Sequence, residues 1–290
     1  MRKNKLSKIL TISMAAVMAL SLASCGSSSS DDSAEGEDIT VISREEGSGT
    51  RDAFTELTGI LEDDVDRTVD TAEISNSTSV VTQSVAGNTA AIGYISLGSL
   101  DDSVKAVKVD GVEATTDNVK SGDYSLQRPF NIVTNGELSE VAQDFVDFIM
   151  SADGQAIIEE EGYIAVDEDA ESYTASGASG TITLAGSTSV SPVMEVLADA
   201  YKELNSDVTI EIQQTGSGAG IQSTIEGVCD IGMASRALED EEASEGLESQ
   251  EIALDGIAVI VNSENSVEEL TTEQIMQIYI GEITNWSEVE

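Results

Sequence analysis

The chain has 290 residues, of which 13 are Lys or Arg, 55 are Asp or Glu and none is His, so its formal net charge is -42 at pH 7. This acidity argues against nucleic acid or an anionic membrane surface as a binding partner, because both require a basic protein face. The missing histidines exclude Ser-His-Asp catalysis and histidine zinc sites. The length favours two lobes, since about 100–200 residues per domain is usual.

The N-terminus carries four basic residues among its first eight, followed by the apolar run 9–23. This layout is typical of a secretory signal, and the run is too short for a membrane span. It ends in LASC, which resembles the lipobox of bacterial lipoproteins, where the cysteine, here Cys25, is lipidated and becomes the first mature residue. A core-helix interpretation of the run would leave Cys25 unexplained. We expect a signal peptide over 1–24, then lipidated Cys25 and a flexible acidic tether over 25–38, on the extracytoplasmic face of the cell membrane.

Three segments share the order strand, small-residue turn, helix. The first is ITVIS, the turn of SREEGSGT and a helix from Arg51; the others begin with the strands 181–184 and 208–212. Further buried-looking strands are AAIGYISL, CDIGMAS and IALDGIAVIVN, and helical spacing is evident from Val141 and after Thr271 or Thr272. Residues 167–180 are polar and contain Gly and Ser, which is typical of a linker. The pattern predicts an α/β protein.

The turns contain groups that suit an anion. A helix start leaves backbone N–H groups unpaired and carries a partial positive charge, and Ser or Thr hydroxyls add donors. Arg44 adds a charged fork for a tetrahedral oxyanion, and Glu46 is close enough in sequence to orient it. We expect Arg51 and Arg236 to form solvent-facing ion pairs. If the turns converge, the hydroxyl donors are Ser48, Thr50, Thr188, Ser189 and Ser217.

Other interpretations of these turns are weaker or fail. One GSGT turn alone is more often an ordinary helix N-cap, and TGSGAG alone could be a flexible loop. No GxxxxGK[ST] phosphate loop is present, and a GxSxG serine has no histidine to activate it. Cys229 lies in an apolar setting, which favours a small core residue over a reactive thiol.

Five segments together resemble the phosphate-binding proteins of bacterial ATP-driven phosphate importers. They are SREEGSGTRDAF, AGSTSVSPVMEVLADAY, QQTGSGAGIQSTIEGVCDIGMASRAL, IALDGIAVIVN and LTTEQIMQIYIGEITNW. The resemblance implies a two-lobed periplasmic-binding-protein fold of the second type, capture of inorganic phosphate, and its delivery to the permease subunits of the importer, without catalysis, cofactor or metal. We expect a monomer. The phosphate ligands that it implies are Arg44, Ser48, Gly49 and Thr50 from one lobe and Thr188, Ser189, Ser217 and Ser235 from the other.

The segment order differs from that of the family, where the GSTSV turn comes first and SREEGSGT follows ITNW. This order predicts a circular permutation, in which residues 167–180 join the family's usual ends. The lobes expected are 39–100 plus 263–290, and 104–262.

Selectivity is the open point. Ser235 stands where the family's well-studied members have an aspartate that accepts the proton of hydrogen phosphate, so rejection of sulfate is weakened. The alternative is a binding protein or sensor for another tetrahedral oxyanion such as sulfate or molybdate. A phosphate-handling enzyme would need a nucleophile–base pair or a metal cluster, and the sequence presents neither.

Overall fold

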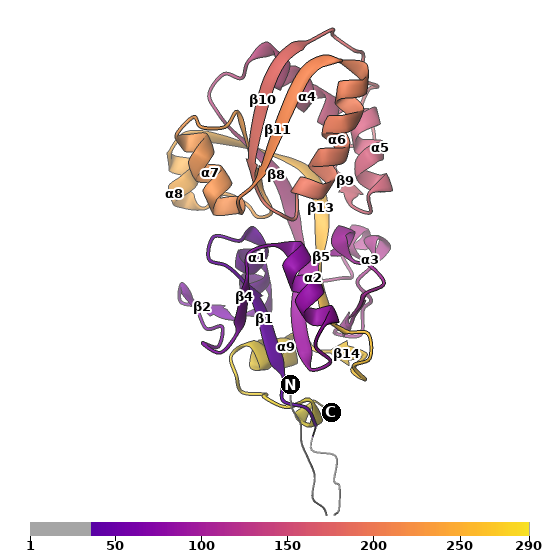
Figure 1. Cartoon of the computed structure of the whole chain (residues 1–290), viewed down its shortest axis with the longest axis vertical. Coiled ribbons are helices and arrows are strands. Elements are labelled where there is room, and N and C mark those ends of the chain that lie inside the picture. The colour runs from indigo at the N-terminus through magenta and orange to yellow at the C-terminus, as the bar shows by residue number, and fades with distance from the viewer. Residues whose placement is uncertain (1–35, 290) are drawn as a thin grey trace, which may run out of the picture. The chain divides into compact units, whose positions relative to one another are not determined.

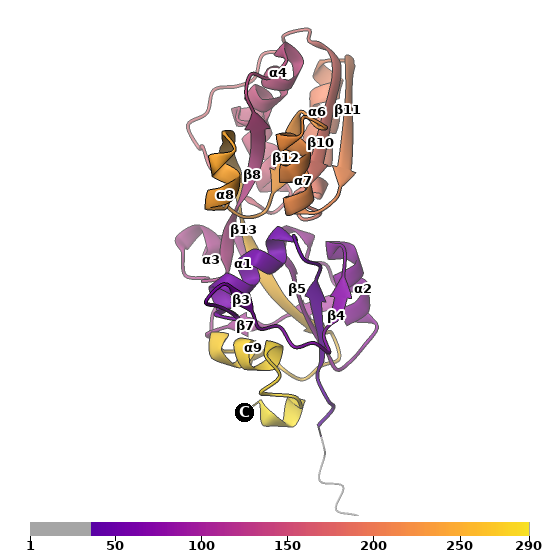
Figure 2. The same cartoon turned by 90° about the vertical axis from the view of Figure 1, so that its left-hand side faces the viewer.

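The computed structural model describes residues 36–289. These residues form two lobes with separate apolar cores, called lobe I and lobe II here, which lie below and above in Figure 1 and are seen from the side in Figure 2. Cys25, the expected signal peptide and most of the tether lie outside the described residues. Within the described part, no helix is both long and apolar enough to cross a membrane.

Lobe I begins with the first strand-turn-helix unit and ends with the last helix of the chain. Helix α1 starts after the N-cap Ser48, and α9 starts with a capping box between Thr271 and Gln274, as the Thr271 alternative predicted. The elements of this lobe are β1 Thr40–Arg44, α1 Gly49–Thr58, β2 Leu61–Glu62, β3 Val65–Asp66, β4 Glu73–Ser75, α2 Thr78–Ala86, β5 Ala91–Ser96, η1 Leu97–Ser99, β6 Val104–Ala106, β7 Lys108–Val109, α3 Thr116–Ser121, β14 Glu269–Leu270, α9 Thr272–Tyr279 and η2 Trp286–Glu288.

Lobe II holds the second and third strand-turn-helix units. Helix α6 has Pro192 in its first turn, where a missing N–H costs no helical hydrogen bond. Of the expected linker 167–180, residues 167–178 contain no helix or strand, whereas its last two residues begin β10. The elements of this lobe are α4 Glu140–Ile149, α5 Ala152–Glu160, β10 Ser179–Gly186, α6 Ser191–Leu204, β11 Asp207–Gln214, α7 Ser217–Ile225, β12 Ile231–Ala234 and α8 Asp240–Ser244.

Two long strands, β8 Gln127–Asn135 and β13 Leu247–Asn262, connect the lobes. The sheet order is β11-β10-β12-β8-β13-β5-β1-β4, and the short strand β9 Ile164–Ala165 pairs with β13 where the lobes meet. Strand β13 pairs with β8 over residues 247–256 and with β5 over 257–261. The outer strands of each lobe are parallel, so their carboxyl ends, and the turns that follow them, face the junction between the lobes.

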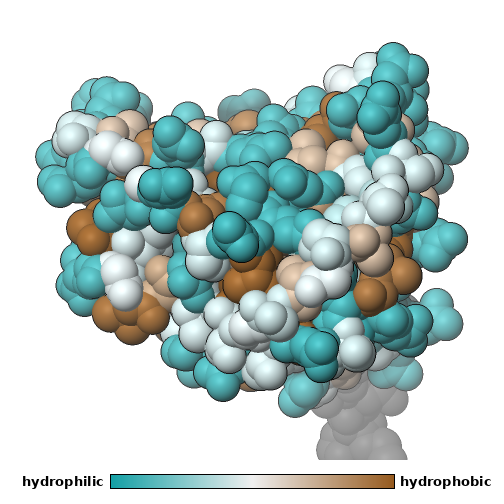
Figure 3. All heavy atoms as spheres, turned by 90° about the horizontal axis from the view of Figure 1, so that it is seen from above, coloured by the Kyte–Doolittle hydropathy of each residue, from teal (hydrophilic) through white to brown (hydrophobic). Residues whose placement is uncertain are grey.

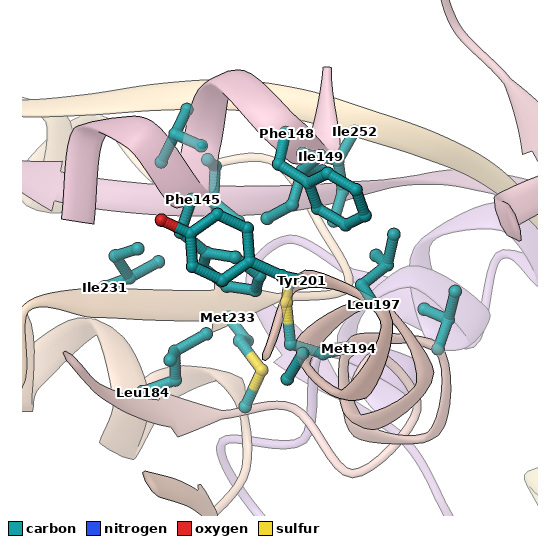
Figure 4. Packing of buried hydrophobic residues seen from close by; sticks show 14 of the residues in the cluster. Phe145, Phe148, Ile149, Leu184, Met194, Leu197, Tyr201, Ile231, Met233 and Ile252 are labelled. Atoms are coloured by element: carbon teal, nitrogen blue, oxygen red, sulfur yellow. The ribbon is translucent and has the colours of Figure 1, made fainter. Parts of the chain in front are cut away.

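Each core is organised around aromatic rings. In lobe I the Phe54 ring stacks on Tyr94 with ring centres 3.9 Å apart. In lobe II the Tyr201 ring lies among Phe145, Phe148 and aliphatic side chains (Figure 4). Burying such rings contributes about 1.5–3 kcal/mol each, so each lobe has a substantial core of its own.

The expected lobe boundary near Val104 is displaced. Segment 104–126 packs into the core of lobe I through Val107, Val119 and Tyr124. Its strands β6 and β7 pair with β13 and β14, and these long-range pairings decide its place. The chain therefore enters lobe II at about residue 127. The expected boundary after residue 262 is displaced as well, because β13 pairs with β5 from Ile257 and packs there into the core of lobe I.

The two ends of the described chain are adjacent. Ile39 N donates to Thr284 O at 2.8 Å, and Trp286 N donates to Glu37 O at 3.1 Å. The chain is strongly acidic in composition, and Figure 3, seen from above lobe II, shows hydrophilic residues spread widely over that face with smaller apolar areas between them. This matches the solvated surface that so acidic a chain should have.

Candidate functional site

Three helix starts meet between the lobes. Helix α1 follows β1, α6 follows β10, and α7 follows β11, so each begins at the carboxyl end of a parallel strand. A backbone hydrogen bond across the junction, from Gly218 N to Gly47 O at 3.0 Å, brings the first and third turns together. Gly47 has φ +79° and Gly216 has φ +90°, a region that favours glycine. The convergence that the sequence analysis required is therefore present.

Arg44, at the end of β1, is buried with 2% of its surface exposed. Its Nε and Nη2 donate to the two carboxylate oxygens of Glu45 at 2.8 Å each, and Nη2 also donates to Thr188 Oγ1 of lobe II at 3.1 Å. The expectation that Glu46 orients this arginine is wrong. Glu46 is exposed, because the chain turns after Glu45, and Glu45 holds the guanidinium in place.

A cluster of side-chain hydroxyls surrounds this arginine, and we call it the hydroxyl cluster. Its members come from both lobes and all are buried: Thr50, Thr78, Ser187, Thr188, Ser189, Ser217 and Ser235. The hydroxyls of Thr50 and Ser189 are 2.9 Å apart across the junction, Ser187 Oγ donates to Ser235 Oγ at 3.0 Å, and Ser217 and Ser235 are 3.3 Å apart. Hydroxyls both donate and accept, so the cluster can rearrange around a polar ligand.

Ser48 and Gly49 complete the expected set in different ways. Ser48 Oγ accepts from Arg51 N at 3.4 Å and caps α1, so its hydroxyl serves the helix rather than the cluster. At Gly49, an added Cβ would overlap Ser217 Oγ and lie 2.8 Å from Ser235 Oγ. Only glycine allows the start of α1 to approach lobe II this closely. All eight residues predicted for the site are thus brought together at one place.

Arg51 and Arg236 form ion pairs as expected, but Arg236 is buried rather than solvent-facing, and Arg51 is half-buried. Arg51 Nε donates to Asp66 at 2.7 Å within lobe I, while Arg236 is 9% exposed and donates to Asp52 of lobe I at 2.9 Å and to Glu242 of lobe II at 2.7 Å. Burial raises the pKa of Asp52, against the lowering effect of Arg236. We call the Arg236–Asp52 pair the latch, because it crosses from one lobe to the other.

Sequence reasoning missed Thr78 and Ser187. Thr78 Oγ1 lies 3.4 Å from Thr188 Oγ1 and 3.3 Å from Ser189 Oγ. A signal for it exists, because the tetrapeptide STSV occurs twice, at residues 77–80 and 187–190. Both copies lie at helix starts, and the structure places them face to face.

A pocket of about 470 Å³ lies beside the hydroxyl cluster, between α2 and α6. Thr78 and Thr188 belong to both its lining and the cluster. It therefore adjoins the part of the cluster where the lobes meet.

Known proteins match this chain over most of its length. The PBP superfamily domain matches residues 4–153 and 171–290. Phosphate-binding protein PstS 2 of Streptococcus agalactiae is 47% identical over 100% of this chain and 99% of its own length, and its namesake in Streptococcus pneumoniae is 47% identical over 99% and 100%.

A crystal structure is also similar to the described fold. It is a phosphate ABC transporter, phosphate-binding protein from S. pneumoniae, with 48% identity and a TM-score of 0.72 over 88% of this chain and 100% of that one. The match confirms the expected α/β periplasmic-binding-protein fold, whereas the circular permutation stays a prediction. The chain belongs to the PstS family of phosphate-binding proteins within the PBP superfamily.

Proposed function

We propose that this protein captures inorganic phosphate between its lobes and delivers it to the permease subunits of an ATP-driven importer. The observation that carries the proposal is the buried hydroxyl cluster around Arg44, to which both lobes contribute. Its relatives' names, which refer to phosphate binding and to an ABC transporter, support the same ligand and partner.

The groups of the site suit a tetrahedral oxyanion. Arg44 supplies the positive charge, and Glu45 fixes the orientation of its planar fork. The starts of α1, α6 and α7 add backbone N–H donors and their partial positive charges. We propose that Thr50, Thr188, Ser189, Ser217 and Ser235 exchange their present mutual hydrogen bonds for bonds to phosphate oxygens, with Gly49 giving the backbone close access.

The hydroxyl at position 235 does not by itself select between phosphate and sulfate. A hydroxyl can accept the proton of hydrogen phosphate or donate to a fully deprotonated anion. Phosphate is the proposed ligand, and sulfate or molybdate is the alternative. A direct titration that compares the affinities for the three anions distinguishes between them.

Calorimetric titration of the purified, phosphate-free protein with phosphate, sulfate and molybdate near pH 7 tests the proposal. We expect one phosphate to bind per chain, and we expect sulfate and molybdate to bind with lower affinity. Arg44→Lys should weaken phosphate binding by about tenfold or more, because an ammonium cannot reproduce a two-bond fork. Arg67→Lys, at a half-exposed ion pair with Glu62, is the matched control and should bind as the wild type does. Absence of phosphate binding, or equal affinity for sulfate, would overturn the proposal.

We propose that Cys25 carries a lipid that holds the protein, as a monomer, on the extracytoplasmic face of the membrane. Support comes from the LASC sequence and from the acidic segment between Cys25 and β1, which can act as a tether. A Cys25→Ala chain expressed in its own cells should leave the membrane fraction and appear in the medium or periplasm. Retention of this variant on the membrane would contradict the lipid anchor.

A further inference from the structure

The arginines at the hydroxyl cluster are already paired with carboxylates. Arg44 donates to Glu45, and Arg236 donates to Asp52 and to Glu242. Their positive charges are therefore largely offset before any anion enters the site. A proton taken up by a nearby buried carboxylate would leave the site with a net positive charge, which an anion would feel strongly in a medium of low dielectric.

Arg128 and Asp255 form a further pair of this kind on the strands β8 and β13, which run between the lobes (Figure 1). Both side chains are 1% exposed. The next strands are β5, whose Ser96 donates to Asp255 Oδ1 at 2.9 Å, and then β1, which ends at Arg44. Since neighbouring strands lie about 4.8 Å apart, β13 is about 10 Å from β1. The pair therefore lies behind the anion site.

The charges of this region act on one another. Burial lowers the pKa of Arg128 and the Asp255 carboxylate raises it, while the positive charge of Arg44 lowers it further. Because the effect of Arg44 on Arg128 is reciprocal, a change in the charge of the Arg128–Asp255 pair also reaches the surroundings of Arg44.

The contact between Arg128 and Asp255 is an incomplete one. Nε and Nη2 of Arg128 both donate to one oxygen, Oδ2, at 3.2 and 3.0 Å, whereas strong charge-assisted hydrogen bonds are about 2.7–2.9 Å long. Nη1 is buried and has no hydrogen-bond partner among the described residues. Burial raises the pKa of Asp255 to about 6, against the lowering effects of Arg128 and Ser96. This carboxylate therefore changes its charge close to neutral pH.

The neighbours of Asp255 suit its protonated form as well. Ser96 Oγ now donates to Asp255 Oδ1, and a hydroxyl can turn to accept a proton instead. The Tyr163 hydroxyl lies beside Ser96, is buried, and has no partner within the described part of the chain, so it can accept the bond that Ser96 then donates. Tyr163 and Tyr124 also face Asp255, but burial raises the pKa of both hydroxyls and they stay neutral.

We infer that Asp255 regulates the charge behind the phosphate site: ionised, it neutralises Arg128, and protonated, it leaves Arg128 as an added positive charge that tightens phosphate binding. Asp255 touches no ligand and acts through Arg128, so it is a positioning residue. By linkage, bound phosphate favours the protonated form of Asp255 to the same extent. The inference rests on the proposed phosphate site and adds its regulation by pH.

The test compares the phosphate affinity of the wild-type protein with that of Asp255→Asn by calorimetric titration between about pH 5 and pH 8. The amide has nearly the shape of the protonated carboxyl group and never carries its charge. We expect Asp255→Asn to bind phosphate at least about threefold more tightly than the wild type at pH 8, and within about 1.5-fold at pH 5, where the wild type is protonated too. Taking the ratio of the two affinities at each pH removes the titration of phosphate itself.

Glu62→Gln is the matched control, because it removes one carboxylate from an exposed ion pair of lobe I. Solvent screens that position, so the ratio of its phosphate affinity to that of the wild type should stay near one at every pH. The control separates a local effect of Asp255 from the loss of one negative charge in an acidic protein.

A ratio for Asp255→Asn that is constant over the pH range overturns the inference, because a merely structural effect would not follow the titration of one carboxylate. Should Asp255→Asn fail to fold, the double variant Arg128→Met/Asp255→Met, which removes both charges together, takes its place. The affinity of the wild type relative to the double variant should then rise at least about threefold from pH 8 to pH 5, and an unchanged value overturns the inference. In either case normal phosphate binding by the wild type leaves the proposed function standing, whereas its absence at every pH would overturn both.

Discussion

Ser235 lies inside the hydroxyl cluster, where its hydroxyl accepts from Ser187 and its backbone N–H donates to Ser217 Oγ at 3.1 Å. Its side chain is fully buried, so any charge at this position would act at short range in a medium of low dielectric. The choice between a hydroxyl and a carboxylate here should therefore have a strong influence on which anion is held. Hydrogen phosphate can donate a proton to a carboxylate, whereas sulfate near neutral pH cannot.

Ser235→Asp is expected to raise the ratio of phosphate to sulfate affinity by about tenfold or more, because the new carboxylate repels an anion that has no proton to donate. Ser235→Asn has nearly the same shape without the charge and is the matched control. Titration of both variants with both anions near pH 7 gives the ratios. An equal ratio in the two variants would show that charge at position 235 does not set selectivity.

At the scale of elements, the two connecting strands and the latch govern how the lobes meet. Strands β8 and β13 pair at Arg128 and Asp255, whose fully buried side chains form an ion pair with Nη2–Oδ2 at 3.0 Å. Ser96 of β5 donates to the other carboxylate oxygen of Asp255 at 2.9 Å, so three strands are tied at the junction. The latch lies apart from these strands and must open whenever the lobes separate.

Asp52→Asn weakens the latch and should speed phosphate release several-fold while leaving association nearly unchanged. A partly exposed ion pair contributes up to about 1 kcal/mol, and most effects of such changes fall on dissociation. Asp66→Asn removes the partner of Arg51 within lobe I and should have little effect on release. Stopped-flow measurement of the phosphate dissociation rate tests this prediction. Equal rates in the two variants would show that the latch does not slow phosphate release.

Asp255 makes stability depend on pH in a defined direction. Burial raises its pKa to about 6, against the lowering effects of Arg128 and Ser96. Between about pH 4 and 6 the native protein keeps a proton that the unfolded chain has lost, so this group's contribution to the unfolding free energy falls as pH rises through 6. Urea denaturation should show Asp255→Asn gaining stability relative to the wild type from pH 4.5 to 6.5. A constant difference over that range would show that Asp255 does not titrate there.

The sequence predicted the local elements better than their partners. The strand-turn-helix units could be predicted because β-branched strands, small-residue turns and Pro192 are local signals. The sequence could not predict that segment 104–126 belongs to lobe I, because this depends on its pairing with strands about 150 residues later in the chain. Which of Glu45 and Glu46 meets Arg44 depends on the course of the turn, and Thr78 enters the site only because the lobes bring two STSV segments together.

At the scale of the whole molecule, the two ends of the chain and the linker bear on the predicted permutation. The ends of the described residues are joined by backbone hydrogen bonds of Ile39 and Trp286, while 167–178 connects β9 to β10 without a helix or strand. The chain could therefore be opened in the linker and joined at its present ends, if the fold does not depend on where the chain starts.

A reordered chain tests this directly. It would begin at Ser176, run to Val289, pass through a short Gly/Ser linker to Asp38 and end at Ala175, so that the new ends lie in the exposed part of the linker and Tyr173 keeps its contacts with lobe II. We expect it to fold and to bind phosphate within about threefold of the original order, because permutation at exposed joints is usually tolerated. As a control, a chain opened at Gly256, within the strand shared by both lobes, should fail to fold. Failure of the first chain would mean that the order of segments is essential to the fold.

The hydrogen bond from Gly218 to Gly47 has a use in measurement. A backbone amide exchanges its hydrogen with deuterated solvent only while its bond is open. The exchange rate of the Gly218 amide therefore reports the fraction of time that the lobes spend apart. The paired amides of β8 and β13 should exchange slowly and serve as internal standards. The deuterium uptake of one glycine would report occupancy of the site without any attached dye.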